Sequence, residues 1–257
     1  MGWFEGIFLG IVQGFSEFLP ISSSGHLAIL GYFLNVNEPG KTFEILLHFA
    51  TLLSVIICYR KDIWELLKNP FQKYVLMIIV ACVPAGIVGV FFGDFFDPLF
   101  DSVWFPTIAL FVTATMLFFA DNFRGNKEGK DITLKIAILI GIMQMFAICP
   151  GISRSGSTIF MALLLGLSRT EAAKFSFLMS IPVVLGSFLL ECIDIVKGTA
   201  DIVFEPVHYV AAIAACISGV LAIKLVLTIL NKGRFRYFAY YCCIIALISM
   251  LLLLLGL

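Results

Sequence analysis

Charged residues are scarce in this chain: Asp, Glu, Lys and Arg make up 13% of its 257 residues, against about 25% in soluble domains. Hydrophobic residues make up 61%. A soluble fold of this size has too little polar surface to cover so much apolar side chain. The 17 basic and 17 acidic residues also balance, which argues against nucleic-acid binding and intrinsic disorder. The composition therefore predicts an all-α polytopic membrane protein.

The seven cysteines lack any spacing typical of disulfide pairs or metal sites. They are scattered, mostly inside apolar runs, at Cys58, Cys82, Cys149, Cys192, Cys216, Cys242 and Cys243. A secreted disulfide scaffold is therefore excluded. The N-terminus also lacks a basic segment and a small-residue cleavage site, so we expect no cleavable signal peptide.

Six apolar runs are long enough to cross a bilayer, which takes about 20 helical residues for roughly 30 Å of hydrocarbon. They cover residues 43–60, 74–93, 104–120, 173–193, 207–230 and 237–257. We predict a full transmembrane helix for each run.

Two further apolar regions, residues 3–34 and 133–168, are interrupted at their centres. The first interruption is LPISSSGH at residues 19–26, and the second is CPGISRSGST at residues 149–158. Irregular backbone at membrane depth is tolerated only where protein buries it or water reaches it. We therefore predict two re-entrant helix–loop–helix hairpins whose polar tips meet inside the protein.

The two interruptions match each other position by position. Residues at +9, +11 and +12 from Gln13 and from Gln144 have the same types: Ser22, Ser24 and Gly25 in the first, Ser153, Ser155 and Gly156 in the second. The separation of about half the chain indicates an internal duplication.

The duplication divides one integral membrane domain, residues 1–257, into two repeats. Repeat one covers about 1–121 and repeat two about 132–257, each with one hairpin followed by three spans. Because three is odd, the second repeat enters the membrane from the opposite side. This is an inverted-topology repeat, in which sites form near the midplane at discontinuous helices.

Lys and Arg are distributed unevenly over the predicted loops. One side carries thirteen of them: Arg60, Lys61, Lys68, Lys73, Arg124, Lys127, Lys130, Lys135, Arg169, Lys174, Lys232, Arg234 and Arg236. The other side carries Lys41 and Lys197. The positive-inside rule makes the first side cytoplasmic, so we expect both termini outside the cytoplasm.

Three ionisable residues, Glu17, His26 and Arg154, fall in or beside the interruptions, where charge is costly and usually marks a pathway or site. A carboxylate can hold a divalent cation or orient an imidazole. A hydroxyl such as that of Ser23, or an imidazole, can attack phosphorus or pass a proton. The guanidinium forms a fork for phosphate oxygens. These types favour phosphoryl chemistry, whereas the structural alternative is a buried Glu17–Arg154 pair that only holds the tips together.

Hydroxyls and glycines surround these groups. The hydroxyls are those of Ser22, Ser24, Ser153, Ser155, Ser157 and Thr158, while Gly25 and Gly156 allow close approach of backbone N–H groups to an anion. Each interruption also leads into a half-helix N-terminus, which favours phosphate.

Gln13 shares a helix face with Glu17, where it can position a ligand or a water, or form an interhelical hydrogen bond. Glu44 and His48 share another face; Glu44 is interpreted as a helix-end residue, close enough to the first hairpin to support it.

Residues 13–27, QGFSEFLPISSSGHL, resemble the first signature of the bacitracin-resistance type undecaprenyl-diphosphate phosphatases (BacA/UppP), and residues 150–158, PGISRSGST, resemble the second. The likeness extends over the chain, including KTFE at 41–44. It implies a plasma-membrane hydrolase that converts undecaprenyl diphosphate to undecaprenyl phosphate, the lipid carrier for peptidoglycan precursors, and so confers bacitracin resistance. It also implies the two re-entrant hairpins, the inverted repeat and a divalent cation, magnesium or calcium.

The resemblance assigns roles to individual residues. The catalytic carboxylate, serine, histidine and phosphate-binding arginine fall on Glu17, Ser23, His26 and Arg154. The substrate-binding set is Gln13, Ser22, Ser24, Gly25, Ser153, Ser155, Gly156 and Thr158. The family pattern admits Glu or Gln at position 13. Because Gln13 cannot be an anionic metal ligand or a carboxylate base, Glu17 is the expected metal ligand.

Other functions are weighed on the same residues. Phosphatidic-acid type phosphatases need a second His soon after the Arg and a Lys-x6-Arg-Pro motif, and this sequence has neither. A transporter or flippase for polyprenyl phosphate lipids would use the same inverted-repeat site; His26, three residues from Ser23, favours an enzyme. A purely structural membrane protein would not need two polar interruptions.

The nucleophile stays open among Ser23, His26 and a water that His26 activates. Expected partners are the polyprenyl diphosphate lipid and the surrounding membrane lipids. The sequence leaves the oligomeric state open, a homodimer included.

Overall fold

The computed structural model describes residues 1–34, 36, 41–100, 102–197, 205–232 and 234–256, and this part of the chain is helical with no named strand. Its helices are α1 (Trp3–Phe18), α2 (Ser23–Phe33), α3 (Lys41–Cys58), α4 (Arg60–Lys68), α5 (Lys73–Phe100), α6 (Trp104–Ala120), the 3-10 turn η1 (Gly129–Asp131), α7 (Leu134–Phe146), α8 (Arg154–Leu164), α9 (Arg169–Val196), α10 (Pro206–Asn231) and α11 (Phe235–Leu254). The prediction of an all-α protein is confirmed. The side chains of Lys41 and Thr42, and the end of the sixth predicted span at residue 257, lie outside the description.

All six predicted apolar runs form helices, but they are not six equal spans. Among the described residues, four windows are long and apolar enough to cross a membrane: Lys73–Gly93, Arg169–Ile193, Pro206–Leu230 and Phe235–Leu254. A fifth candidate is the pair α3–α4, which is bent by 81°. Helix α6 has 17 residues and is shorter. The exposed sides of these helices carry large apolar residues such as Phe91, Ile213 and Leu254, so the chain is a multi-pass membrane protein.

Helix α4 is an addition to the prediction, which treated the residues after the first span as a loop. Its sequence alternates charged residues with Ile63, Trp64, Leu66 and Leu67. Ile63 and Leu66 pack against the core, whereas Trp64 and Leu67 are exposed. An amphipathic helix at an angle to its span, with a polar face and exposed apolar residues, is typical of the membrane interface.

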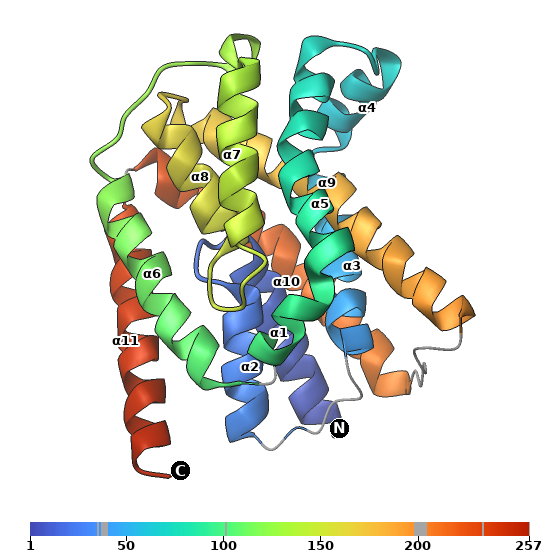
Figure 1. Ribbon diagram of the computed structural model, residues 1–257, viewed down its shortest axis with the longest axis vertical. Coiled ribbons are helices and arrows are strands. Elements are labelled where there is room, and N and C mark those ends of the chain that lie inside the picture. Colours follow the sequence, from blue (N-terminus) through green and yellow to red (C-terminus); the bar gives the residue numbers. More distant parts are fainter. Residues whose placement is uncertain (35, 37–40, 101, 198–204, 233, 257) are drawn as a thin grey trace.

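The two hairpins enter the molecule from opposite ends and meet at its centre (Figure 1). Helices α1 and α2 form one hairpin, with their break at residues 19–22, and α7 and α8 form the other, with their break at 147–153. Both termini lie at one end of the molecule, and α4 lies at the opposite end (Figure 1). Both predicted interruptions are therefore real breaks between helices.

Each hairpin packs its first helix against a long helix of the other half of the chain. A Cβ added to Gly10 of α1 would lie 2.2 Å from the carbonyl oxygen of Ala211 in α10. A Cβ added to Gly141 of α7 would lie 2.5 Å from the carbonyl oxygen of Ala81 in α5. Only glycine allows these close approaches between backbones. The two contacts are built alike, and they fix both hairpin tips against the body of the protein.

Candidate active site

The two half-helices at the tips begin with the same cap. Ser22 precedes α2, and its Oγ accepts a hydrogen bond from the Gly25 N–H at 3.3 Å. Ser153 precedes α8, and its Oγ accepts from the Gly156 N–H at 3.0 Å. Ser22 also has a φ of 72°, a conformation that a residue with a Cβ disfavours. The Ser-x-x-Gly spacing in each break is therefore a serine N-cap.

The tips contact each other directly. The Ser155 hydroxyl donates to the carbonyl oxygen of Leu19 at 3.4 Å. A Cβ at Gly25 would lie 2.9 Å from the Cα of Gly151, which itself has a φ of +91°. Glycine at both positions lets the backbones of the two loops approach, so the predicted meeting of the tips is confirmed.

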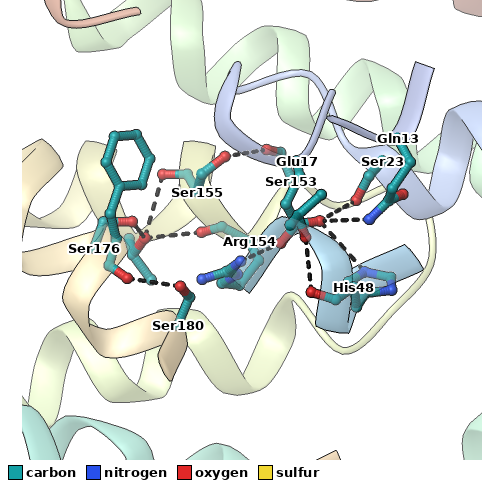
Figure 2. A network of polar contacts seen from close by, with 12 residues as sticks. Gln13, Glu17, Ser23, His48, Ser153, Arg154, Ser155, Ser176 and Ser180 are labelled. Carbon is teal, nitrogen blue, oxygen red and sulfur yellow. Dashed lines mark hydrogen bonds and ion pairs between the residues drawn. The ribbon is translucent and has the colours of Figure 1, made fainter. Parts of the chain in front are cut away.

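Glu17 is the centre of a polar network that joins the tips (Figure 2). Its carboxylate is buried, and its Oε1 pairs with Nη2 of Arg154. The other oxygen, Oε2, accepts from Ser23 Oγ at 2.7 Å and from Gln13 Nε2 at 3.2 Å. Nε2 of His48 in α3 lies 3.3 Å from the same oxygen. One carboxylate is thus held from both hairpins and from α3.

The network forms the polar end of a cavity of about 340 Å³. Glu17, Ser22, Ser23, Ser24, Gln144 and Arg154 are its polar residues at the tips, and α5 and α9 supply apolar walls. Two buried atoms here have no hydrogen-bond partner in the described part of the chain, Nη1 of Arg154 and Oε1 of Gln144. Buried polar atoms are normally paired, so these two indicate room for a polar ligand.

Comparison with known proteins supports a phosphatase family. The family model described as bacitracin resistance protein BacA matches residues 6–248. The chain belongs to this family. It is 38% identical to undecaprenyl-diphosphatase 2 of Bacillus thuringiensis over 261 residues, 96% of each chain. It is 41% identical to undecaprenyl-diphosphatase of Halothermothrix orenii over 252 residues, 97% of each chain. The sequence matches to these relatives cover nearly the whole BacA-family chain and not an isolated motif.

His26 does not join the Glu17 network of this BacA-family protein in the described structure. Its side chain is buried, with Nδ1 2.7 Å from the carbonyl oxygen of Ser22 and Nε2 3.0 Å from the hydroxyl of Tyr241 in α11. The two rings also stack, with centroids 5.5 Å apart. His26 therefore links the first turn of α2 to α11, and its catalytic role stays a prediction from the resemblance.

The predicted substrate-binding residues divide into two groups. Ser22 and Ser24 line the cavity, whereas Gln13 lies behind Glu17 and holds its carboxylate. The others build the tips. The N–H groups of Gly25 and Gly156 donate to the serine caps, the backbone N–H of Ser153 donates to Thr113 at 3.0 Å, Ser155 bonds to Leu19, and the hydroxyl of Thr158 lies 2.7 Å from that of Ser176 in α9.

Three polar residues of the cavity, Glu44, His48 and Gln144, are missing from the predicted site. The sequence analysis interprets Glu44 as a helix-end residue and His48 only as its neighbour on one helix face, although an ionisable side chain inside an apolar run is itself a signal. Gln144 served only as the reference position of the second repeat. Its equivalence to Gln13, one helical turn before Glu17, was the available signal for a place in the site.

The residues present suit a metal ion that is bound together with phosphate. In the described part of the chain, no three His, Cys, Asp or Glu side chains gather as a metal site. Mg²⁺ commonly keeps several waters and binds through one or two carboxylates and the substrate phosphates. Two carboxylate residues, Glu17 and Glu44, line the cavity, which fits that pattern.

A larger cavity, of about 540 Å³, lies between α4, α5, η1 and α9. It shares no lining residue with the cavity at the tips. Two pairs of its polar side chains are engaged with each other: Lys174 pairs with Asp62, and the hydroxyl of Tyr74 donates to Glu171 at 2.6 Å. These contacts connect helix ends, and they offer no arrangement for phosphoryl chemistry.

Proposed function

We propose that this chain is an integral hydrolase of the bacterial plasma membrane that removes the terminal phosphate of undecaprenyl diphosphate. The product, undecaprenyl phosphate, returns as the lipid carrier for peptidoglycan synthesis, and its recycling confers bacitracin resistance. The observation that carries the proposal is the meeting of Glu17, Ser23 and Arg154 in one cavity with a polar and an apolar end. Relatives named undecaprenyl-diphosphatase, whose sequences match nearly the whole chain, support it.

The membrane arrangement proposed here has six full spans and two re-entrant hairpins. Helices α1, α2, α7 and α8 have 16, 11, 13 and 11 residues. At 1.5 Å per residue they are about 16–24 Å long, short of the roughly 30 Å of hydrocarbon. Each hairpin therefore turns back inside the membrane. The end with α4 is cytoplasmic, and both termini lie outside.

The two halves, about 1–121 and 132–257, are proposed to be inverted copies of one unit. The paired serine caps support this, because Ser22 and Ser153 are 131 positions apart and make the same contact. The glycine contacts support it as well, since Gly10 and Gly141 have the same separation and each meets an alanine carbonyl. Inverted repeats place sites at discontinuous helices near the midplane, and the meeting of the tips at the centre of the molecule supports such a site (Figure 1).

Substrate binding uses the groups at the polar end of the cavity. The diphosphate lies between the tips, where Arg154 presents Nη1 to the phosphate oxygens while Nη2 stays on Glu17. The hydroxyls of Ser22 and Ser24 and the N-termini of α2 and α8 add donors and a favourable dipole. A magnesium or calcium ion bound by Glu17 and the phosphate oxygens would neutralise charge on the diphosphate.

The chemical step is proposed to use Ser23 as nucleophile and Glu17 as general base. Ser23 Oγ already donates its proton to Glu17 Oε2, the arrangement expected of an activated hydroxyl. Oγ attacks the terminal phosphorus, its proton passes to Glu17, and the bond to the bridging oxygen breaks to release undecaprenyl phosphate. Water then hydrolyses the phosphoserine. His26 holds the backbone of Ser22 and so positions the neighbouring Ser23.

Phosphate release by the purified protein tests this function. In detergent with magnesium, the wild type releases phosphate from undecaprenyl diphosphate, and Glu17→Gln reduces turnover by about 10³-fold because the proton acceptor is lost. A matched control is Glu191→Gln, since Glu191 does not line the cavity. No phosphate release by the wild type, combined with lipid movement across sealed vesicles, would replace the hydrolase with a flippase.

A further inference from the structure

Three arginines gather where the ends of α6, α9, α10 and α11 meet, on the side of the protein proposed to be cytoplasmic. Arg169 begins α9, Arg236 lies in the first turn of α11, and Arg124 follows the end of α6. The carbonyl oxygen of Leu230 in α10 accepts a hydrogen bond from Nη1 of Arg169 at 3.4 Å. Arg124, Arg169 and Arg236 are called the arginine cluster below. The cluster lines neither of the two cavities described above.

The guanidinium of Arg169 is held in place but not fully used. Its side chain is 12% exposed, and its central carbon lies 5.7 Å from the centre of the Phe235 ring. Nε and Nη2 are buried, and neither atom has a hydrogen-bond partner in the described part of the chain. These two nitrogens form one edge of the guanidinium, which can bind two oxygens of a phosphate side by side. Buried donors are normally paired, so this edge indicates a place for an oxyanion.

Asp121 does not satisfy this edge of Arg169. Its Oδ1 lies 3.9 Å from Nη2 of Arg169, which is beyond hydrogen-bond distance. Both carboxylate oxygens are used at the start of α11: Oδ1 accepts from the N–H of Phe235 at 2.9 Å, and Oδ2 accepts from the N–H of Arg236 at 3.2 Å. Asp121 is therefore a cap of α11.

The cluster carries more positive than negative charge. Arg124 lies close enough to Arg169 for their charges to repel each other. Nε of Arg236 lies 3.9 Å from Oδ2 of Asp121, and Nη2 of Arg236 donates to Oδ1 of Asn122 at 3.3 Å. Among the described residues, Asp121 is the only carboxylate within ion-pair distance of Arg169 or Arg236. A second anion bound between the arginines would offset the remaining positive charge.

The surface beside the cluster is suited to lipid. Helices α6 and α11 lie side by side along one edge of the molecule (Figure 1). Three aromatic side chains within four residues of Asp121 or Arg236 are exposed there: Phe119, Tyr237 and Tyr240. Such residues gather at the boundary between hydrocarbon and headgroups. A ligand with a phosphate at the cluster and acyl chains along this edge matches both features.

We propose that the arginine cluster binds the phosphate group of an anionic phospholipid. The Nε and Nη2 edge of Arg169 binds two phosphate oxygens. Because both donors are buried, surface side chains move aside as the phosphate enters, and the long, exposed side chains of Arg124 and Arg236 turn toward it. Basic pockets between membrane helices on the cytoplasmic side are suited to such headgroups. The bound lipid stabilises the junction of the four helix ends, and the site does not depend on the phosphatase chemistry.

Binding of short-chain phosphatidylglycerol, measured by titration calorimetry in an uncharged detergent, tests the site. The wild type binds it about tenfold more tightly than phosphatidylcholine of equal chain length, whose choline cancels the phosphate charge. Arg169→Gln weakens phosphatidylglycerol binding about tenfold because the fork is lost. Arg124→Gln weakens it about threefold, since an exposed cation contributes less. Arg60→Gln removes an exposed charge elsewhere on the same side; it is the matched control and leaves the Kd unchanged.

The outcomes separate a built site from general attraction to a basic surface. Equal loss of affinity in Arg169→Gln and Arg60→Gln would overturn the proposal, and so would equal binding of the two lipids by the wild type. If Arg169→Gln does not fold, Arg124→Gln decides, and wild-type affinity in that variant would overturn the proposal.

Inorganic phosphate is the second probe, because a free anion has the same chemistry as the headgroup. Phosphatidylglycerol is expected to raise the unfolding temperature of the wild type by several degrees and that of Arg169→Gln by less than half as much. Inorganic phosphate is expected to leave both temperatures unchanged. An equal rise with inorganic phosphate, lost in Arg169→Gln, would assign the site to a free anion and overturn the lipid assignment.

Discussion

Ser23 and Arg154 bind opposite oxygens of the same carboxylate, that of Glu17. Each is the first residue of its half-helix, each follows a serine cap, and they are 131 positions apart in the chain. Equivalent positions therefore carry a serine hydroxyl in the first hairpin and a guanidinium in the second. The position equivalent to Glu17 is Ile148. The divergence leaves one carboxylate at this pair of equivalent positions, and it avoids the repulsion of two buried like charges there.

Removal of Arg154 is expected to destabilise the protein more when Glu17 is present than when Glu17 has been replaced by Gln. Arg154→Ala removes the guanidinium that pairs with a buried carboxylate and leaves His48 as the remaining ion-pair contact, which costs about 3–5 kcal/mol. Glu17→Gln in the same chain removes the stranded charge, so the double variant regains most of the lost stability. Thermal unfolding of the four proteins in detergent measures this coupling. Additive losses would show that the two side chains do not interact.

His48 is expected to position the Glu17 carboxylate. Its Nδ1 donates to the carbonyl oxygen of Glu44 at 2.8 Å, which fixes the ring with Nε2 toward Glu17. His48→Leu removes this contact and lowers kcat by about 10-fold to 10²-fold, whereas His48→Gln keeps an amide donor and loses less. Steady-state kinetics on both variants provide the comparison. Equal activity of His48→Leu and the wild type would exclude a positioning role.

Tyr241 is expected to matter through His26. Tyr241→Phe keeps the stacked ring but removes the hydroxyl partner of His26 Nε2, at a cost of about 1 kcal/mol. Activity falls less than about tenfold, because Ser23 and Glu17 stay in place.

Trapping the phosphorylated protein by rapid acid quench and mass spectrometry locates the phosphate on Ser23. Phosphate on His26 would make the imidazole the nucleophile and contradict the proposed role.

The equivalent glycine contacts of the two hairpins predict that a Gly→Ala substitution lowers the unfolding temperature at either position. Gly10→Ala and Gly141→Ala each place a methyl group within 2.5 Å of a backbone oxygen of the partner helix and lower the unfolding temperature by several degrees. Gly86→Ala, in open space on α5, is the control and leaves it unchanged. A stable Gly141→Ala protein would show that α7 and α5 are not packed as described.

Hydropathy and residue spacing predicted much of this fold for identifiable reasons. Long apolar runs and Ser/Gly interruptions are local signals, so the six long helices and both hairpins were expected from them. These signals did not predict the orientation of the side chains at the tips, because that orientation depends on how each helix is rotated against its neighbours. His26 turns toward Tyr241, and His48 occupies the place beside Glu17. Helix α4 was missed because its charges interrupt the apolar pattern.

Phosphate release from undecaprenyl diphosphate by Ser23→Ala and Arg154→Lys, one variant for each tip, tests the shared site most directly. Ser23→Ala removes the hydroxyl, and Arg154→Lys keeps the charge but loses the guanidinium fork. Both are predicted to lose at least about 10²-fold in kcat/KM while unfolding close to the wild-type temperature. If either folded variant released phosphate at nearly the wild-type rate, its tip would not belong to the active site.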